Sequence, residues 1–275
     1  MRPWLVVTSS TAVALLLSGS TAQASVALSP DTTVSLGGTT FTDDEPFLDL
    51  LMGTIVGLPL GTLPDPSDVN AYHFSSINGD QLYSLDITVD LGGLTVGPGD
   101  VVRFDGTTDT VEFDASAEGI PDGVMVDAVT VHSSGDLMLS FDTTLDLGGG
   151  VTADDEDLVR FDGVSTYTVD FDGSAQSVPA GLDLDGAAFQ ASDGHLFLSF
   201  SGSGTLGGVD FDDEDILEFD PVGTTWAMFY DGSSQHAELA ATDVNALPEP
   251  HSMLQRGVAI VFLGCLTRVR SRRRD

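Results

Sequence analysis

The sequence contains no lysine, and all nine of its basic residues are arginines. Acidic residues number 43, which gives a formal net charge of −34 at pH 7. The region between Ser25 and Leu247 carries 41 of these acids and only two arginines, Arg103 and Arg160. Such a field repels nucleic acid and anionic membrane surfaces and attracts cations. The charge therefore predicts that nucleic acid is not a partner.

The single cysteine is Cys265, so the chain cannot form an internal disulfide bond. No HExxH, GxSxG or glycine-rich phosphate loop is present. The four histidines His73, His132, His195 and His236 occupy no position that recurs in every repeat, so no histidine site is repeated throughout the chain. We predict no catalytic residues and a protein that is not an enzyme. The open alternative is a secreted glycan hydrolase that uses two loop carboxylates.

The N-terminus has the pattern of a secretory signal. Arg2 precedes the apolar stretch "LVVTSSTAVALLLSGS", which leads to small residues at Ala22 and Ala24. A charged start, a short apolar core and an A-x-A site are typical of a signal peptide. We expect signal peptidase to remove residues 1–24.

The C-terminus consists of the triplet Pro248, Glu249 and Pro250, an apolar segment and a cluster of arginines. The predicted membrane segment and its basic stop comprise Val258, Ile260, Val261, Phe262, Leu263, Arg268, Arg270, Arg272, Arg273 and Arg274. Arginines after an apolar segment stay on the cytoplasmic side. The uninterrupted apolar run spans about 16 Å as a helix, against about 30 Å of hydrocarbon, so the transmembrane helix is marginal in length.

This three-part ending resembles the PEP-CTERM sorting signal, which exosortases of Gram-negative bacteria recognise. Pro248, Glu249 and Pro250 carry the resemblance, which covers residues 248–274. It implies export across the inner membrane, transient anchoring and cleavage near the motif by an exosortase. It also implies a final place on the cell surface or outside the cell, in association with exopolysaccharide and biofilm.

Between the two ends, residues 25–247 consist of repeats. The segment "DLMLSFDTTLDLGGGVTADDEDLVRFDG" from Asp136 matches "GHLFLSFSGSGTLGGVDFDDEDILEFDP" from Gly194. The predicted units are 25–67 (partial), 68–126, 127–184, 185–242 and 243–247 (partial), followed by the sorting tail 248–275. The body is therefore one repeat domain.

Apolar residues alternate within each unit, as in Leu137, Leu139 and Phe141, and this period of two predicts strands. Tight Asn-Gly and Asp-Gly turns separate the alternating runs. The clearest unit predicts strands at about 127–133, 137–145, 157–161 and 166–172. In the last of these, Tyr167, Val169 and Phe171 are expected to share one face.

Four antiparallel strands in tandem copies indicate the blades of a β-propeller, although about 58 residues is long for a blade. The N-terminal piece lacks a first strand, and residues 243–247 repeat only the start of one. Together they predict a closed four-bladed ring with a short closing strand before Pro248. An open β-repeat stack and a two-sheet sandwich remain alternatives.

The densest acidic motif is "DDED", at Asp154–Asp157 and again at Asp212–Asp215. Crowded oxygen ligands on loops suit Ca²⁺. The candidate Ca²⁺ ligands are Asp155, Glu156, Asp157, Asp213, Glu214 and Asp215. The counterpart "DDEP" lies at Asp43–Pro46, whereas "GPGD" at Gly97–Asp100 has lost most of the acids. A solvated acidic loop is the alternative interpretation, and a Ca²⁺-dependent adhesive module is one of the possible functions.

The aspartate of each "FDG" sequence is expected to shape a turn. The neighbouring Phe104, Phe161 and Phe219 are expected in the core. Trp226 and Tyr230 alternate like core positions, although they could also stack on a sugar. The sequence as a whole predicts an exported surface or matrix protein with a non-catalytic β-repeat domain that binds or has a structural role.

Overall fold

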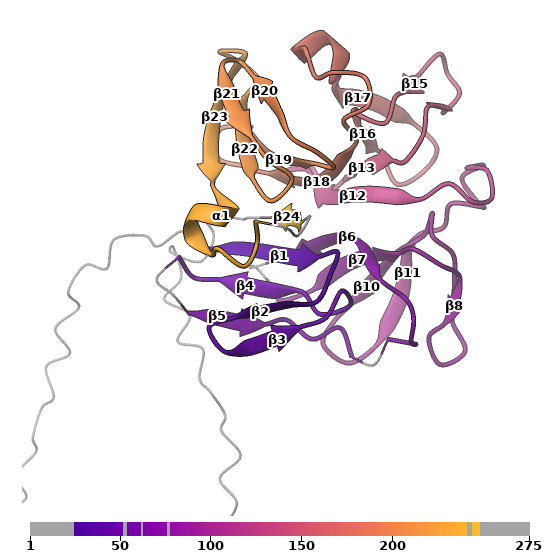
Figure 1. Cartoon of the computed structure of the whole chain (residues 1–275). Coiled ribbons are helices and arrows are strands. Elements are labelled where there is room, and N and C mark those ends of the chain that lie inside the picture. The colour runs from indigo at the N-terminus through magenta and orange to yellow at the C-terminus, as the bar shows by residue number, and fades with distance from the viewer. Residues whose placement is uncertain (1–24, 52–53, 62, 76–77, 241–243, 248–275) are drawn as a thin grey trace, which may run out of the picture.

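The computed structural model describes residues 25–51, 54–61, 63–75, 78–240 and 244–247. This part of the chain forms four antiparallel sheets of four strands each. The sheets stand around a common axis as the blades of a β-propeller (Figure 1). The innermost strands of the four blades neighbour one another around that axis. The all-β prediction and the four-bladed ring are therefore confirmed.

Each blade has one strand at the axis, and the other three follow it outward. From the axis, blade 1 contains β24 (Val244–Leu247), β1 (Val26–Pro30), β4 (Phe47–Asp49) and β5 (Ile55–Gly57). Blade 2 contains β6 (Val69–Phe74), β7 (Gln81–Leu85), β10 (Val101–Phe104) and β11 (Asp109–Phe113). Blade 3 contains β12 (Val126–Val131), β13 (Leu137–Phe141), β16 (Leu158–Phe161) and β17 (Tyr167–Phe171). Blade 4 contains β18 (Leu184–Phe189), β19 (Leu196–Phe200), β22 (Ile216–Asp220) and β23 (Thr225–Tyr230).

A small hairpin lies between the second and third strands of every blade, and it explains the length of the repeat. The hairpins are β2 (Val34–Leu36) with β3 (Thr39–Phe41), β8 (Val89–Asp90) with β9 (Thr95–Val96), β14 (Leu145–Asp146) with β15 (Thr152–Ala153), and β20 (Gly204–Leu206) with β21 (Val209–Phe211). Two single turns of helix, η1 (Ser174–Gln176) and α1 (Gly232–Gln235), follow the outer strands of blades 3 and 4.

The predicted strand at 137–145 is wrong in its extent, because it is broken after Phe141. The next residue, Asp142, leaves the ladder and bonds to the segment before β12. Its backbone N–H donates to the Met125 carbonyl at 3.2 Å, and its Oδ1 accepts from the Met125 N–H at 2.9 Å. The chain then starts β14 in the separate hairpin.

The ring closes between the two ends of the described chain. Strand β24 pairs antiparallel with β1, and Ala27 lies opposite Leu247. Blade 4 adds side-chain contacts to blade 1, because the Tyr230 hydroxyl donates to Asp49 Oδ2 at 3.0 Å. His236 Nε2 lies 2.9 Å from the same oxygen, and the Asp49 side chain is fully buried. The predicted sharing of one blade by the two ends of the body is confirmed, with a closing strand of four residues.

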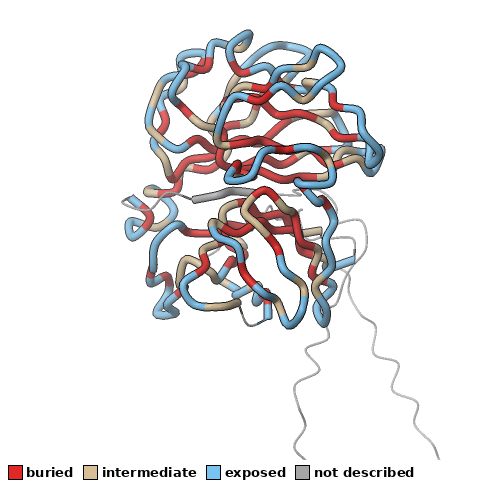
Figure 2. The backbone as a smooth tube through the Cα atoms, turned by 90° about the vertical axis from the view of Figure 1, so that its right-hand side faces the viewer, coloured by how far each residue is buried: buried red, intermediate tan, exposed pale blue. Residues whose placement is uncertain are grey.

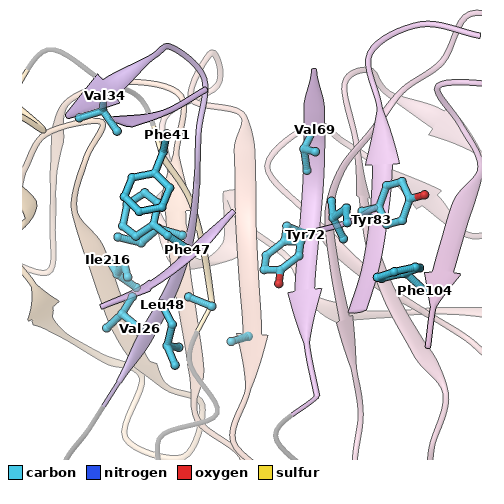
Figure 3. Packing of buried hydrophobic residues seen from close by; sticks show 14 of the residues in the cluster. Val26, Val34, Phe41, Phe47, Leu48, Val69, Tyr72, Tyr83, Phe104 and Ile216 are labelled. Atoms are coloured by element: carbon cyan, nitrogen blue, oxygen red, sulfur yellow. The ribbon is translucent and has the colours of Figure 1, made fainter. Parts of the chain in front are cut away.

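The hydrophobic core lies between neighbouring blades, and Figure 2 shows its buried backbone inside a shell of exposed turns. Strand β13 is buried on both faces: Leu137, Leu139 and Phe141 pack toward blade 2, whereas Met138 packs toward blade 4. The prediction that Leu137, Leu139 and Phe141 share one face is confirmed. In blade 1, the rings of Phe41 and Phe47 stack with centroids 4.8 Å apart (Figure 3).

The outer strand of blade 3 differs from the prediction in one respect. Tyr167 and Val169 share a face as expected, but Phe171 packs in the opposite cluster. The cause is a bulge, because the pairing jumps from Val159–Val169 to Leu158–Phe171. One extra residue in a strand moves the next side chain to the other face.

Candidate functional site

The candidate site is a pocket of about 440 Å³ where the first strands of blades 2, 3 and 4 end. We call it the axial pocket. Its volume lies within the range of about 300–1,000 Å³ that is usual for ligand sites. The lining includes His73, Asp80, Arg103, Val131, His132 and Phe189. Short turns between the first and second strands of the blades supply most of the remaining wall.

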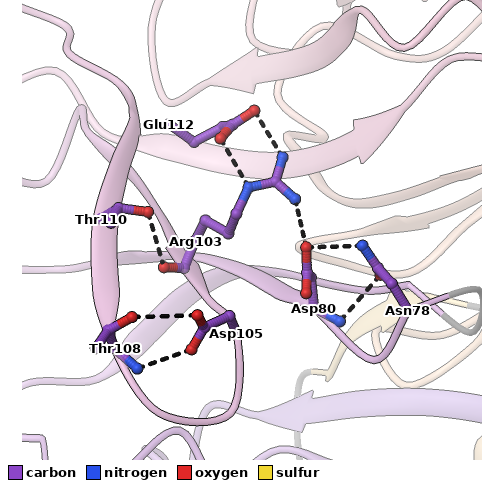
Figure 4. A network of polar contacts seen from close by, with 7 residues as sticks. All are labelled: Asn78, Asp80, Arg103, Asp105, Thr108, Thr110 and Glu112. Carbon is purple, nitrogen blue, oxygen red and sulfur yellow. Dashed lines mark hydrogen bonds and ion pairs between the residues drawn. The ribbon is translucent and has the colours of Figure 1, made fainter.

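Arg103 on β10 forms the polar wall of the pocket (Figure 4). Its Nε and Nη2 donate to both carboxylate oxygens of Glu112 at 2.8 and 2.7 Å. Its Nη1 donates to Asp80 Oδ2 at 2.7 Å. Asn78 Nδ2 donates to the same Asp80 oxygen at 2.8 Å. The bidentate pair fixes the guanidinium plane, so Arg103 and Asp80 present a donor and an acceptor in a defined geometry.

His132 forms a second wall together with the aromatic ring of Phe189. The two rings lie with centroids 4.5 Å apart, tilted by 46°. The Ser134 backbone N–H donates to His132 Nδ1 at 3.2 Å, and Arg160 Nη1 lies 3.4 Å from the same atom. The Ser134 hydroxyl, which donates to Asp136 Oδ2 at 2.7 Å, also lies 2.7 Å from His132 Nδ1, so these contacts together fix the orientation of the imidazole ring.

His73 lies deeper and is almost fully buried. Burial, with a smaller effect from the nearby Arg103, lowers the pKa of His73 to about 4. The imidazole is therefore neutral at physiological pH. Its Nδ1 lies 3.3 Å from the Thr130 hydroxyl, which also accepts from the Phe189 backbone N–H at 3.3 Å. The Thr130 hydroxyl therefore links the His73 imidazole to the backbone of β18.

The pocket gathers basic residues that the sequence places far apart. Arg103 and Arg160, the only arginines between Ser25 and Leu247, occupy equivalent positions on the third strands of blades 2 and 3. Arg103 lines the pocket, and Arg160 contacts the lining residue His132. His73 and His132 are each the sixth residue of a predicted unit, but the strand register makes Thr130, and not His132, the counterpart of His73. Only the convergence of the first strands at the axis brings His73 and His132 into one wall.

The acidic turns lie next to the hairpins, and their aspartates hold backbone groups. Asp157 Oδ2 accepts from the Asp154 N–H at 3.0 Å, and its Oδ1 accepts from the Gly173 N–H at 2.8 Å. Asp215 repeats both bonds in blade 4, at 2.9 Å to Asp212 and 3.0 Å to Gly232. These two carboxylates tie the turn to the segment that follows the outer strand.

The second residue of each turn connects one blade to the next. The Asp155 carbonyl accepts from the Leu184 N–H, at the start of β18, at 3.0 Å. The carbonyls of Pro98 and Asp43 accept in the same way from Val126 at 3.0 Å and Val69 at 3.3 Å. The turn therefore has a structural role in the ring whether or not its side chains are acidic.

Glu156 and Glu214 are buried, each with only 3% of its surface exposed, so they do not form a solvated acidic loop. Burial is the largest cause that raises the pKa of Glu156 to about 7, and a hydrogen bond with Asp155 adds to it. Burial also raises the pKa of Glu214. Among the described residues, no group of three or more His, Cys, Asp or Glu is arranged to hold a metal ion. A Ca²⁺ site at Asp155, Glu156, Asp157, Asp213, Glu214 and Asp215 stays a prediction.

The aspartates of the "FDG" turns have the expected structural role. Asp105 Oδ1 accepts from the backbone N–H groups of Thr107 and Thr108, both at 2.9 Å (Figure 4 draws Asp105 with Thr108). Asp162 bonds to the turn that follows it in the same manner, and so does Asp220 in the corresponding "FDP" turn of blade 4. These backbone hydrogen bonds lower the pKa of all three aspartates.

The aromatic residues that the sequence places beside the turns and in the last blade lie in the core. Phe104, Phe161, Phe219 and Tyr230 are buried. Trp226 is partly buried and packs against Phe219, with ring centroids 4.8 Å apart. The core interpretation of these positions is confirmed, and none of them lines the axial pocket.

The remaining predicted sites lie outside the described residues. They are the signal cleavage site at Ala22 and Ala24, the motif Pro248–Glu249–Pro250, and the apolar segment with its arginines. In the part of the chain that the structure describes, no helix is long and apolar enough to cross a membrane.

No protein-family model matches the chain, and no curated protein matches it. Solved structures with a similar chain path include hemopexin fold protein CP4 from cow pea. The two proteins are 11% identical, and the alignment covers 74% of this chain and 91% of the cow pea protein, with a TM-score of 0.40. Virginiamycin B lyase from Staphylococcus aureus is 14% identical and covers 73% of this chain and 69% of its own, with a TM-score of 0.33. The β-propeller domain of Cps50 (Swd1) from Myceliophteria thermophila is 13% identical and covers 69% and 53%, with a TM-score of 0.30. These superpositions are loose, so the four-bladed propeller assignment rests on the strand order and the ring closure.

Proposed function

We propose that this chain is an exported protein of the bacterial surface or matrix, whose four-bladed propeller is a non-catalytic binding domain. The observation that carries the proposal is the pocket at the end of the first strands, held in a closed ring. Its polar groups are fixed by one another: Arg103 by Glu112 and Asp80, and His132 by Ser134. Such preorganised groups suit recognition, because little side-chain freedom remains to be lost on binding.

The two ends of the sequence support the exported location. In this proposal signal peptidase acts after Ala24, and an exosortase cleaves near Pro248–Glu249–Pro250. The strongly acidic region 25–247 agrees with an extracellular location, where salt screens the repulsion between its carboxylates. Binding to exopolysaccharide would then retain the processed domain in the matrix.

Intact-mass analysis of protein secreted by a Gram-negative host that contains an exosortase tests the processing step. The expected product starts at Ser25 and lacks Arg272–Arg274. A variant with alanine at positions 248–250 should keep the arginines and stay with the cells. Secreted material that still carries Arg272–Arg274 would contradict the proposal.

A pulldown of the secreted protein on the exopolysaccharide of the producing cells tests the binding role. The expected result is retention of the protein without new reducing ends on the polymer. Release of reducing ends would instead identify a hydrolase.

A further inference from the structure

We propose that the axial pocket is a binding site for a neutral saccharide, with Arg103, Asp80, His132 and Phe189 as its recognition groups. The inference rests on the proposed binding function and names the ligand class of that same site. The lining combines polar donors, a carboxylate acceptor and an aromatic ring within about 440 Å³. A sugar presents the matching set, since vicinal hydroxyls both donate and accept while the ring C–H groups form an apolar face.

The hydrogen-bonding groups have capacity beyond the bonds they already make. The described contacts of Arg103 occupy only some of its N–H donors, and the others can reach a ligand. Asp80 receives Arg103 and Asn78 on Oδ2, so Oδ1 offers an acceptor beside the guanidinium. His132 lines the same pocket and adds its imidazole as a further polar group. Adjacent donors and acceptors of fixed orientation favour a polyol over a ligand with a single polar group.

The charges of the site favour a neutral ligand over an anionic one. Both carboxylates that bind Arg103, Asp80 and Glu112, already compensate its positive charge. His73 is neutral because its pKa is lowered to about 4. The whole chain adds a formal charge of −34. An acidic saccharide would therefore be repelled by the negative field and would meet a guanidinium whose charge the two carboxylates already compensate.

The apolar side of the pocket completes the match. Phe189 and Val131 line it between the polar walls, and the Phe189 ring is held against His132. The Phe189 backbone is anchored in turn by its hydrogen bond to Thr130. An aromatic ring fixed in this way can take the C–H face of a pyranose at small cost in side-chain entropy.

NMR titration of the ¹⁵N-labelled full-length chain tests the site. The probes are cellotriose, maltotriose and mannotriose as neutral ligands, and trigalacturonate as an acidic one. At least one neutral trisaccharide should shift the amide signals of Val131, His132 and Phe189. Arg103→Gln and Phe189→Ala should each weaken that binding at least about tenfold, the effect of losing one good polar or stacking contact.

Glu218→Gln is the matched control, because Glu218 has the position of Arg103 in blade 4 and pairs with His195 at 2.6 Å outside the pocket. It should leave the affinity unchanged, and Asp80→Asn should weaken binding even if the Phe189 variant fails to fold. The proposal is overturned by tighter binding of trigalacturonate, by equal loss in Arg103→Gln and Glu218→Gln, or by no response to any neutral probe at about 10 mM. Such a failure leaves the intact-mass result on export unaffected, and a failure of processing leaves this titration unaffected.

Discussion

Blades 2 and 3 build the same turn before their third strands, yet they fill the space beside it in opposite ways. Asp100 in blade 2 accepts from the N–H groups of Gly97 and Ala115 at 2.8 and 2.9 Å. Asp157 in blade 3 makes the equivalent two bonds. The residue before each aspartate differs, since it is Gly99 in blade 2 and Glu156 in blade 3.

The partner across the turn compensates for this difference. In blade 3 a Cβ on Gly173 would lie 2.5 Å from the Glu156 carbonyl oxygen and would also clash with the Glu156 side chain. In blade 2 the equivalent residue is Ala115, and a Cβ on Gly99 would lie only 2.8 Å from the Ala115 Cβ. Each turn therefore has room for one side chain, either on the residue before the aspartate or on the residue across the turn. Blade 4 follows blade 3, with Glu214 against Gly232.

The comparison separates two kinds of acid within "DDED". The last aspartate satisfies backbone donors in blades 2, 3 and 4, so the turn depends on it. The glutamate before it occupies space that an alanine on the opposite segment can take instead. The glycines of "GPGD" therefore belong to a second packing solution, and beside it blade 2 has a hollow of about 420 Å³.

The largest expected effect is that of Gly173→Ala in blade 3. Gly173 has φ −60° and ψ −42°, which any residue adopts, so only the contact with Glu156 opposes a side chain there. Overpacking against backbone should lower the free energy of unfolding by about 2–4 kcal/mol. Urea unfolding of the full-length chain measures it.

The double variant Gly173→Ala/Glu156→Gly recreates the blade 2 arrangement and serves as the control. It removes the contacts of the new methyl group with Cβ and Cγ of Glu156 but keeps the contact with the carbonyl oxygen of position 156, so it should recover only part of the lost stability. Additive losses in the double variant would show that the two blades do not exchange one side chain for the other.

A smaller loss is expected from Asp157→Ala. The change leaves the backbone N–H groups of Asp154 and Gly173 without their acceptor, at a cost of about 2 kcal/mol. Asp154→Ala removes a half-exposed carboxylate that accepts from the Thr144 hydroxyl, and should cost below about 1 kcal/mol. Equal losses in the two variants, measured by the same unfolding titration, would refute the special role of the last aspartate.

The strands and the closed ring were predictable because period two and the phase of the repeats survive in every copy. The position of the N-terminal turn was not. "DDEP" aligns with "DDED" by letter, but the structure pairs Val34 with Phe41 and Leu145 with Ala153. The first hairpin is therefore one residue shorter, and Glu45, not Pro46, takes the place of Asp157. Its Oε2 accepts from the Thr42 N–H at 3.1 Å.

The pocket was unpredictable for a related reason. His73 lies within β6, His132 follows the end of β12, and Arg103 comes from a third strand. No fixed spacing along the chain joins these residues. Their meeting depends on how the blades are turned around the axis, which the alternation of apolar residues does not encode.

The smallest expected effect is a pH dependence of the stability, which should differ between blade 2 and blades 3 and 4. The folded chain keeps Glu156 protonated up to a pKa of about 7, whereas an unfolded glutamate releases its proton near 4.5. Between these values the folded state binds more protons, so its stability is greatest below about pH 4.5 and falls as the pH rises to 7. Asp127 and Asp68, with pKa values raised to about 7 and 6, chiefly by burial, act in the same direction.

Glu156→Gln keeps the shape of the side chain and removes its charge. The variant should gain about 1 kcal/mol at pH 8, a value reduced by the screening of water at the rim of the ring, and little at pH 4.5. Thermal unfolding at both values measures the difference.

Blade 2 has no group to titrate at Gly99, so the pH-dependent loss should fall on the turns of blades 3 and 4. Hydrogen exchange should then show faster opening of the amides of Asp157 and Asp215 at high pH than of Asp100, after correction for the intrinsic rate. Uniform opening of all three turns would place the pH dependence in the ring as a whole and not in its buried glutamates.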